Sequence, residues 1–117
     1  MPKVLVVDDE PAIVEVLQTF LSRNGHTVRT AFDGPAALRS VRADRPDVVL
    51  LDLRMPGMGG LEVLRCIREI DHELKVIILS GILDEETRQQ VLDLGAHACF
   101  PKPIDLRVLE RFLMGAT

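Results

Sequence analysis

The stretch Pro46-Asp47-Val48-Val49-Leu50-Leu51-Asp52 sets the fold class of this 117-residue chain. It holds four apolar residues in a row, bounded by Pro-Asp on one side and a carboxylate on the other, without the polar alternation of a half-exposed strand. Such a run is typical of a strand covered on both faces, as in a parallel sheet flanked by helices. We therefore predict a buried central strand at 48–51 that ends at Asp52.

Short apolar runs on either side of this strand predict four more strands, at 3–7, 27–31, 76–79 and 98–101. Apolar residues at helical spacing, together with start and stop signals, predict helices between and after them, at 11–24, 33–43, 61–70, 84–94 and 105–114. This alternation predicts an α/β fold, a doubly wound parallel five-stranded sheet with helices on both faces. Sheets of such (βα)5 units commonly take the flavodoxin-like order 2-1-3-4-5, which we expect here.

Composition excludes several classes of function. The formal net charge is −4 and no run of Lys or Arg occurs, which argues against direct nucleic-acid binding and against attachment to an anionic membrane. No signal-peptide layout and no apolar stretch of about 20 residues is present, so we expect a cytoplasmic protein. The length favours one domain over residues 1–117, with no output domain. We expect both cysteines to be reduced and His26, His72 and His97 to be solvated.

Polar side chains lie at the carboxyl ends of the predicted strands. Asp8 and Asp9 follow the first strand, Asp52 the third, Ser80 the fourth and Lys102 the fifth. In a parallel sheet these ends share one edge, where the carboxylates repel one another unless a cation lies among them. Mg²⁺ prefers such oxygen ligands, and a lysine and a hydroxyl suit phosphoryl oxygens. Asp52, at the end of the most buried strand, is the predicted nucleophile of a phosphoryl transfer.

Four motifs, in this order, resemble the receiver domain of two-component response regulators: Val6-Val7-Asp8-Asp9-Glu10, Leu51-Asp52-Leu53-Arg54-Met55-Pro56, Ser80-Gly81 and Lys102-Pro103. Each motif alone is common, and their joint placement at matching strand ends over nearly the whole chain carries the resemblance. It implies a signalling switch rather than a turnover enzyme, with catalysis limited to the phosphorylation and dephosphorylation of the domain itself.

The resemblance implies how the phosphoryl group is received. Asp52 would accept it from the phosphohistidine of a sensor histidine kinase or a phosphotransfer domain. Ser80 and Lys102 would then contact the phosphoryl oxygens. In the family the peptide bond that corresponds to Lys102-Pro103 is typically cis, and we expect the same here.

The resemblance also implies a metal site and a partner surface. Asp9 would bind Mg²⁺ (or Mn²⁺) directly and Asp8 largely through water, while Asp52 and the backbone carbonyl of Arg54 would complete the protein ligands. A homodimer or a docked partner is expected on the face formed by the segments 84–94, 98–101 and 105–114.

Three departures from the family pattern carry further expectations. Receivers usually have Tyr or Phe three residues before the lysine, where this chain has Cys99. Phe100 is expected on the opposite face of the strand, so it does not replace the missing ring. Signalling would then rely on the loop and helix that follow the fourth strand. Gly59 replaces an acidic or polar residue, which is expected to loosen the start of the next helix. Of the two variable positions that tune phosphoryl lifetime, Arg54 and Ile82, the apolar Ile82 cannot orient attacking water, which predicts a long-lived phosphorylated state.

Two other functions remain open at this point. A pseudo-receiver would bind partners without phosphate control, which Cys99 favours and the acidic site opposes; Mg²⁺ binding separates the two. A small phosphatase with an aspartyl-phosphate intermediate would need an Asp-x-Asp pair at the first strand, and the chain has Asp8-Asp9-Glu10 there.

Overall fold

The computed structural model describes residues 2–81 and 84–115, in which strands and helices alternate as predicted. The elements are β1 (Lys3–Val7), α1 (Pro11–Arg23), β2 (Thr27–Ala31), α2 (Gly34–Ala43), β3 (Val48–Asp52), α3 (Gly60–Ile70), β4 (Lys75–Ser80), α4 (Glu85–Asp93), β5 (Ala98–Pro101) and α5 (Leu106–Leu113). Each predicted boundary lies within one residue of the observed one. No helix in the described part of the chain is long and apolar enough to cross a membrane.

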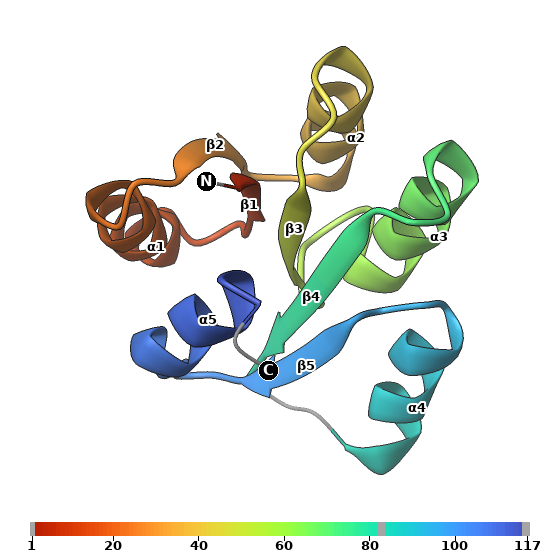
Figure 1. The fold of residues 1–117 in the computed structure, drawn as a ribbon. Coiled ribbons are helices and arrows are strands. Elements are labelled where there is room, and N and C mark those ends of the chain that lie inside the picture. Colours follow the sequence, from red (N-terminus) through yellow and green to blue (C-terminus); the bar gives the residue numbers. More distant parts are fainter. Residues whose placement is uncertain (1, 82–83, 116–117) are drawn as a thin grey trace.

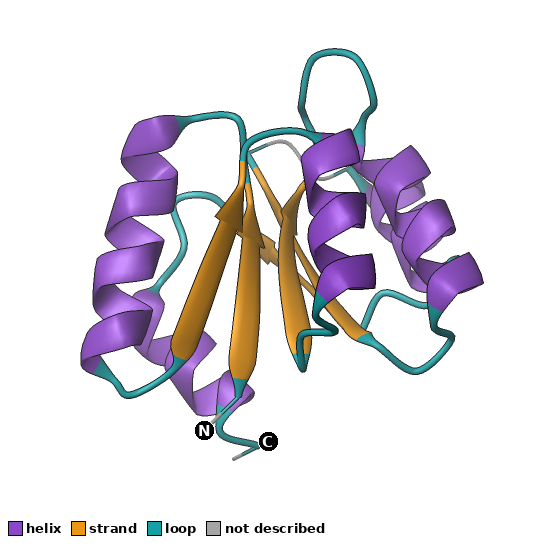
Figure 2. Ribbon diagram, turned by 90° about the horizontal axis from the view of Figure 1, so that it is seen from above, coloured by secondary structure: helices purple, strands orange, loops and turns teal. Residues whose placement is uncertain are grey.

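The strands form one sheet with helices packed on it (Figure 2). The strands are parallel and their order is β2-β1-β3-β4-β5, which confirms the flavodoxin-like (βα)5 prediction. β3 pairs with β1 on one side and with β4 on the other, so that Leu50 stands between Val6 and Ile77. Every residue of β3 is buried. The apolar run that predicted a central strand is therefore explained by burial on both faces of the sheet.

Helices cover both faces of the sheet, with α2, α3 and α4 on one face and α1 and α5 on the other (Figure 1). Alternate residues of a strand serve different cores: Val49 packs towards α2 and α3, and Leu50 packs towards α1 and α5. Both side chains are fully excluded from solvent. This two-sided burial fixes the direction and register of the strands, and with them the positions of the residues at their carboxyl ends.

Capping side chains define the starts of two helices that border this edge. The Asp33 carboxylate accepts a hydrogen bond from the Ala36 backbone N–H at 2.8 Å, and the Asp84 carboxylate accepts one from the Thr87 N–H at 2.7 Å. Each bond satisfies one of the backbone donors that a helix leaves free in its first turn. By contrast, α3 starts after Gly59, which has no capping side chain.

The structure corrects one prediction, that all three histidines are solvated. His72 and His97 are exposed, but the His26 side chain is fully buried, and its Nε2 lies 2.6 Å from Glu110 Oε1 on α5. The turn after α1 has Gly25 at φ 89°, and His26, the next residue, lies against α5. The partner is supplied by a helix 84 residues away along the chain, so local sequence gives no sign of it.

Candidate functional site

The predicted site residues meet at the carboxyl edge of the sheet. Asp52 and Ser80 are the last residues of β3 and β4, Asp8 and Asp9 directly follow β1, and Lys102 directly follows β5. Because β1, β3, β4 and β5 are parallel, their ends open on the same side. Four chain segments that are distant in sequence are thereby brought to one place.

A half-buried ammonium group joins two of the carboxylates. Lys102 Nζ donates to Asp8 Oδ2 at 2.8 Å and lies 3.2 Å from Asp52 Oδ1. The side chains of Asp8 and Asp52 are 2% and 5% exposed, and that of Lys102 is 16% exposed, so water screens these contacts weakly. The backbone also holds the lysine, because the Lys102 N–H donates to the Ser80 carbonyl at 2.9 Å. The Lys102-Pro103 peptide bond is cis, as expected.

The electrostatics of the site centre on Asp52. Burial raises the pKa of its carboxyl group and the charge of Asp8 raises it further, while Lys102 and the backbone N–H of Arg54 oppose the shift. Burial lowers the pKa of the Lys102 ammonium, but its hydrogen bond to Asp8 and its attraction to Asp52 outweigh burial, and the net pKa is raised. The lysine therefore stays charged, and the site has a carboxylate whose ionisation costs free energy unless a further cation is near.

The donor set at this edge fits a hard divalent cation. Asp8, Asp9 and Glu10 each offer a carboxylate oxygen, and these oxygens lie within 4.8 Å of one another. Asp8 is buried, Asp9 half-buried and Glu10 exposed, so the cluster runs from the sheet edge to solvent. Oxygen ligands of this kind suit Mg²⁺, which uses one or two carboxylates and keeps water for its other positions. Glu10 was not among the predicted ligands, although the run of three acidic residues was visible in the sequence.

The residues that depart from the family pattern also have defined places. Cys99 packs against the core beneath α2, α3 and α4, whereas Phe100 packs on the opposite face against Phe112, with ring centroids 5.6 Å apart. Burial raises the pKa of the Cys99 thiol, an effect that Arg88 partly opposes, so the thiol is not activated. Both cysteines are free, as predicted. Ile82, on which the lifetime prediction depends, lies outside the described residues.

Comparison with known proteins identifies the family. A family model described as the response regulator receiver domain matches residues 4–113. The chain belongs to this family. The assignment makes it a signalling domain of the two-component type, and the receiver fold agrees with the observed strand order.

Relatives of this receiver domain are found among curated proteins and solved structures. Response regulator MprA of Mycobacterium ulcerans (strain Agy99) is 42% identical over 107 residues, which cover 92% of this chain and 46% of the relative. MprA of Mycobacterium tuberculosis (strain ATCC 25177 / H37Ra) is 41% identical with the same coverage. The receiver domain thus spans less than half the length of these curated relatives.

Solved structures resemble it over its whole length. Vibrio cholerae chemotaxis protein CheY4 is 30% identical, with a TM-score of 0.92, and the match covers 100% of this chain and 99% of the other. The receiver domain of NtrX from Brucella abortus is 34% identical, with a TM-score of 0.90 and 97% of each chain covered. Both likenesses confirm the fold as that of a receiver domain.

Proposed function

We propose that this receiver domain accepts a phosphoryl group on Asp52 from the phosphohistidine of a sensor histidine kinase or phosphotransfer domain, with Mg²⁺ (or Mn²⁺) bound beside it. The observation that carries the proposal is the position of Lys102 Nζ, 2.8 Å from Asp8 and 3.2 Å from Asp52. A fixed ammonium group at a buried carboxylate offers charge to the oxygens of a transferring phosphoryl group.

In the proposed step a carboxylate oxygen of Asp52 bonds to phosphorus while the bond from phosphorus to the donor imidazole nitrogen breaks. The electron pair of that bond stays on the imidazole, and the product on this chain is an acyl phosphate. Lys102 donates to one phosphoryl oxygen and the Ser80 hydroxyl to another. Later attack by water on phosphorus releases phosphate and restores the Asp52 carboxylate.

Metal binding follows from the acidic cluster at the same edge. In the proposal Asp9 binds Mg²⁺ directly, Asp8 largely through water, and Asp52 and the Arg54 backbone carbonyl complete the protein ligands. When bound, the ion supplies positive charge to the phosphoryl oxygens. Supporting this role, burial and Asp8 raise the pKa of Asp52, so the nucleophile needs positive charge nearby to stay ionised.

The test is the intact mass of the protein after incubation with phosphoramidate, with Mg²⁺ or with a chelator. We expect a gain of one phosphoryl group that requires Mg²⁺ and is lost in Asp52→Asn. Asp47→Asn is the matched control, because Asp47 is an exposed carboxylate just before the same strand, at the opposite edge of the sheet. No gain in the wild type under any condition would overturn the proposal and favour the pseudo-receiver. Turnover of a generic phosphate ester would instead support a phosphatase.

Partner binding is the second part of the proposed function. We infer that residues 1–117 act as one receiver domain and that phosphorylation changes docking or dimerisation on the face formed by α4, β5 and α5. Leu92 on α4 is 37% exposed, and Met114, just after α5, is 51% exposed, so exposed apolar side chains lie on or next to two of these elements. We expect sedimentation velocity to show association of the phosphorylated wild type and none of Asp52→Asn. A monomer in both samples would exclude dimerisation.

A further inference from the structure

The C-terminal ends of α3 and α4 meet at one side chain, that of Arg68 on α3. Its Nη2 donates to the Gly95 carbonyl at 2.8 Å and its Nε to the Leu94 carbonyl at 3.3 Å, both just after α4. Its Nη1 donates to the carbonyl of Asp71, the C-cap residue of α3, at 3.1 Å. Carbonyls at helix ends lack partners within the helix and carry partial negative charge. One guanidinium group therefore binds the ends of both helices.

The fit around this guanidinium is tight. Gly95 has φ 89°, and a Cβ atom at this position would lie 2.8 Å from Arg68 Nε, so the backbone after α4 packs directly on the side chain. A guanidinium presents its donors in a rigid planar fork, which can serve several carbonyls at once, whereas an ammonium is a single point charge. The contact is thus specific to arginine in its geometry as well as in its charge.

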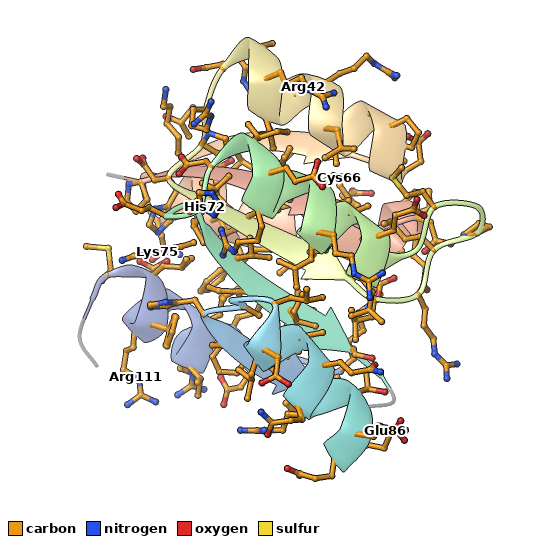
Figure 3. All side chains as sticks on the ribbon, turned by 90° about the vertical axis from the view of Figure 1, so that its right-hand side faces the viewer. Arg42, Cys66, His72, Lys75, Glu86 and Arg111 are labelled. Atoms are coloured by element: carbon orange, nitrogen blue, oxygen red, sulfur yellow. The ribbon has the colours of Figure 1, made fainter. Side chains whose placement is uncertain are left out.

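Few side chains of α4 itself are buried. Within residues 85–93, all of them described, Val91 is the one buried side chain, so apolar packing fixes little of the helix. Its start, at Asp84 and Thr87, borders a cavity of about 250 Å³ that Ser80 and Gly60 also line. In Figure 3, Glu86 marks the N-terminal end of α4, and His72 lies just beyond the C-terminal end of α3. One end of α4 therefore borders the proposed phosphorylation site while Arg68 holds the opposite end.

We propose that Arg68 anchors the C-terminal end of α4 to α3, so that phosphorylation of Asp52 moves α4 about this end. The second half of this inference rests on the proposed function. A helix behaves as a short rod, and a rod bound at one end and sparsely packed along its length shifts most at the other end. Arg68 is then a positioning residue that acts through α4 and contacts neither Asp52 nor the phosphoryl group.

Amide hydrogen exchange resolved along α4 tests the anchor in the unphosphorylated protein. The N–H groups of residues 94–96 donate to carbonyls of the last turns of α4, and these bonds should open more often without the guanidinium. Arg68→Met removes both hydrogen bonds to the end of α4, and we expect it to speed this exchange at least about tenfold, the effect of losing one hydrogen bond to a charged group. Arg68→Lys, which keeps the charge and guards against a folding failure of the first variant, should act in the same direction with a smaller effect.

The matched control is Arg65→Met, because Arg65 is an exposed arginine on the same helix. It should leave the exchange of residues 94–96 unchanged. If Arg68→Met and Arg68→Lys both exchange like the wild type at these amides, the anchor is refuted.

A second arm adds phosphoramidate and Mg²⁺ to the same proteins. In the wild type, exchange should change at residues 85–88 and stay constant at 94–96; in Arg68→Met the change should extend to 94–96. A merely structural arginine would leave the phosphorylation-dependent pattern in place, and an equal change at both ends of α4 in the wild type would refute the pivot. Intact mass of the same samples reports phosphorylation separately. If the wild type gains no phosphoryl group, both the proposed function and the movement of α4 about its C-terminal end are refuted. The exchange rates of the unphosphorylated proteins still test whether Arg68 anchors that end.

Discussion

Replacing Gly60 by alanine should disturb the site through the backbone alone. A Cβ atom at Gly60 would lie 2.6 Å from the Leu53 Cα and 2.7 Å from the Asp52 carbonyl oxygen, so main-chain atoms rather than a flexible side chain must move. The Gly60 N–H also donates to the Leu53 carbonyl at 3.0 Å, and this bond weakens when the two segments separate. The φ of Gly60 is not positive, so the conflict is steric and does not arise from backbone conformation.

The magnitude follows from opposing contributions. Overpacking costs about 1–3 kcal/mol and the weakened hydrogen bond about 1 kcal/mol, while alanine returns about 1 kcal/mol at a helical position. The net loss is about 2 kcal/mol. An unfolding entropy of about 2.1 cal/mol/K per residue converts this loss into a drop of about 8 °C in melting temperature for a chain of this length.

Thermal denaturation by circular dichroism measures this drop. Gly81→Ala is the control, because a Cβ atom there would meet nothing within 4 Å among the described residues, and its melting temperature should stay near that of the wild type. The rate of phosphoryl gain from phosphoramidate should also fall in Gly60→Ala, since Leu53 adjoins both Asp52 and Arg54. A Gly60→Ala protein that melts within about 2 °C of the wild type would refute the steric argument.

Three further outcomes concern buried or capping charges. Glu110→Ala should lower the free energy of unfolding by about 2 kcal/mol, because it leaves the buried His26 ring without its partner. Urea denaturation should show this as a lower midpoint at an unchanged slope, and an unchanged midpoint would contradict it. The pKa of Asp84 is lowered by hydrogen bonds from Thr87, so the ionised carboxylate stabilises the fold above the ordinary carboxyl pKa. This stability is lost as the pH falls through the lowered value. Below about pH 4 the melting temperature of Asp84→Asn should therefore fall less than that of the wild type. The pKa of Asp52 is raised, mainly by burial and further by Asp8, so its contribution to folding stability is present at low pH and is lost as the pH rises through the raised value. At neutral pH, with chelator present, Asp52→Asn should therefore have a higher melting temperature than the wild type. A lower melting temperature would contradict the claim that the buried Asp52 charge destabilises the fold.

The strand ends were predictable because their signals are local. An unbroken apolar run such as Val48–Leu51, bounded by turn residues, is typical of a strand buried on both faces, and the residue that closes the run then lies at the edge of the sheet. The same reasoning placed Ser80 after its strand without knowledge of any contact. What joined these residues into a site was the parallel order of the strands, which the alternation with helices required.

Other features could not be read from the sequence, since they depend on packing between distant segments. The burial of His26 requires α5 to lie across the turn after α1, and the role of Arg68 requires the backbone at Gly95 to pass against its side chain. Neither residue has a neighbour in sequence that indicates this. The ammonium of Lys102 was expected near a phosphoryl group, but its bond to Asp8 became visible only in three dimensions.

The shared lysine also fixes the charge balance of the carboxyl edge. Asp8, Asp9, Glu10 and Asp52 contribute four negative charges, and Lys102, bound between two of them, cancels one. Three negative charges remain, and one divalent cation neutralises two of these. An anionic donor would then approach a less negative surface when the cation is present, so that cation availability, as well as the nucleophile, would decide when the domain accepts a phosphoryl group.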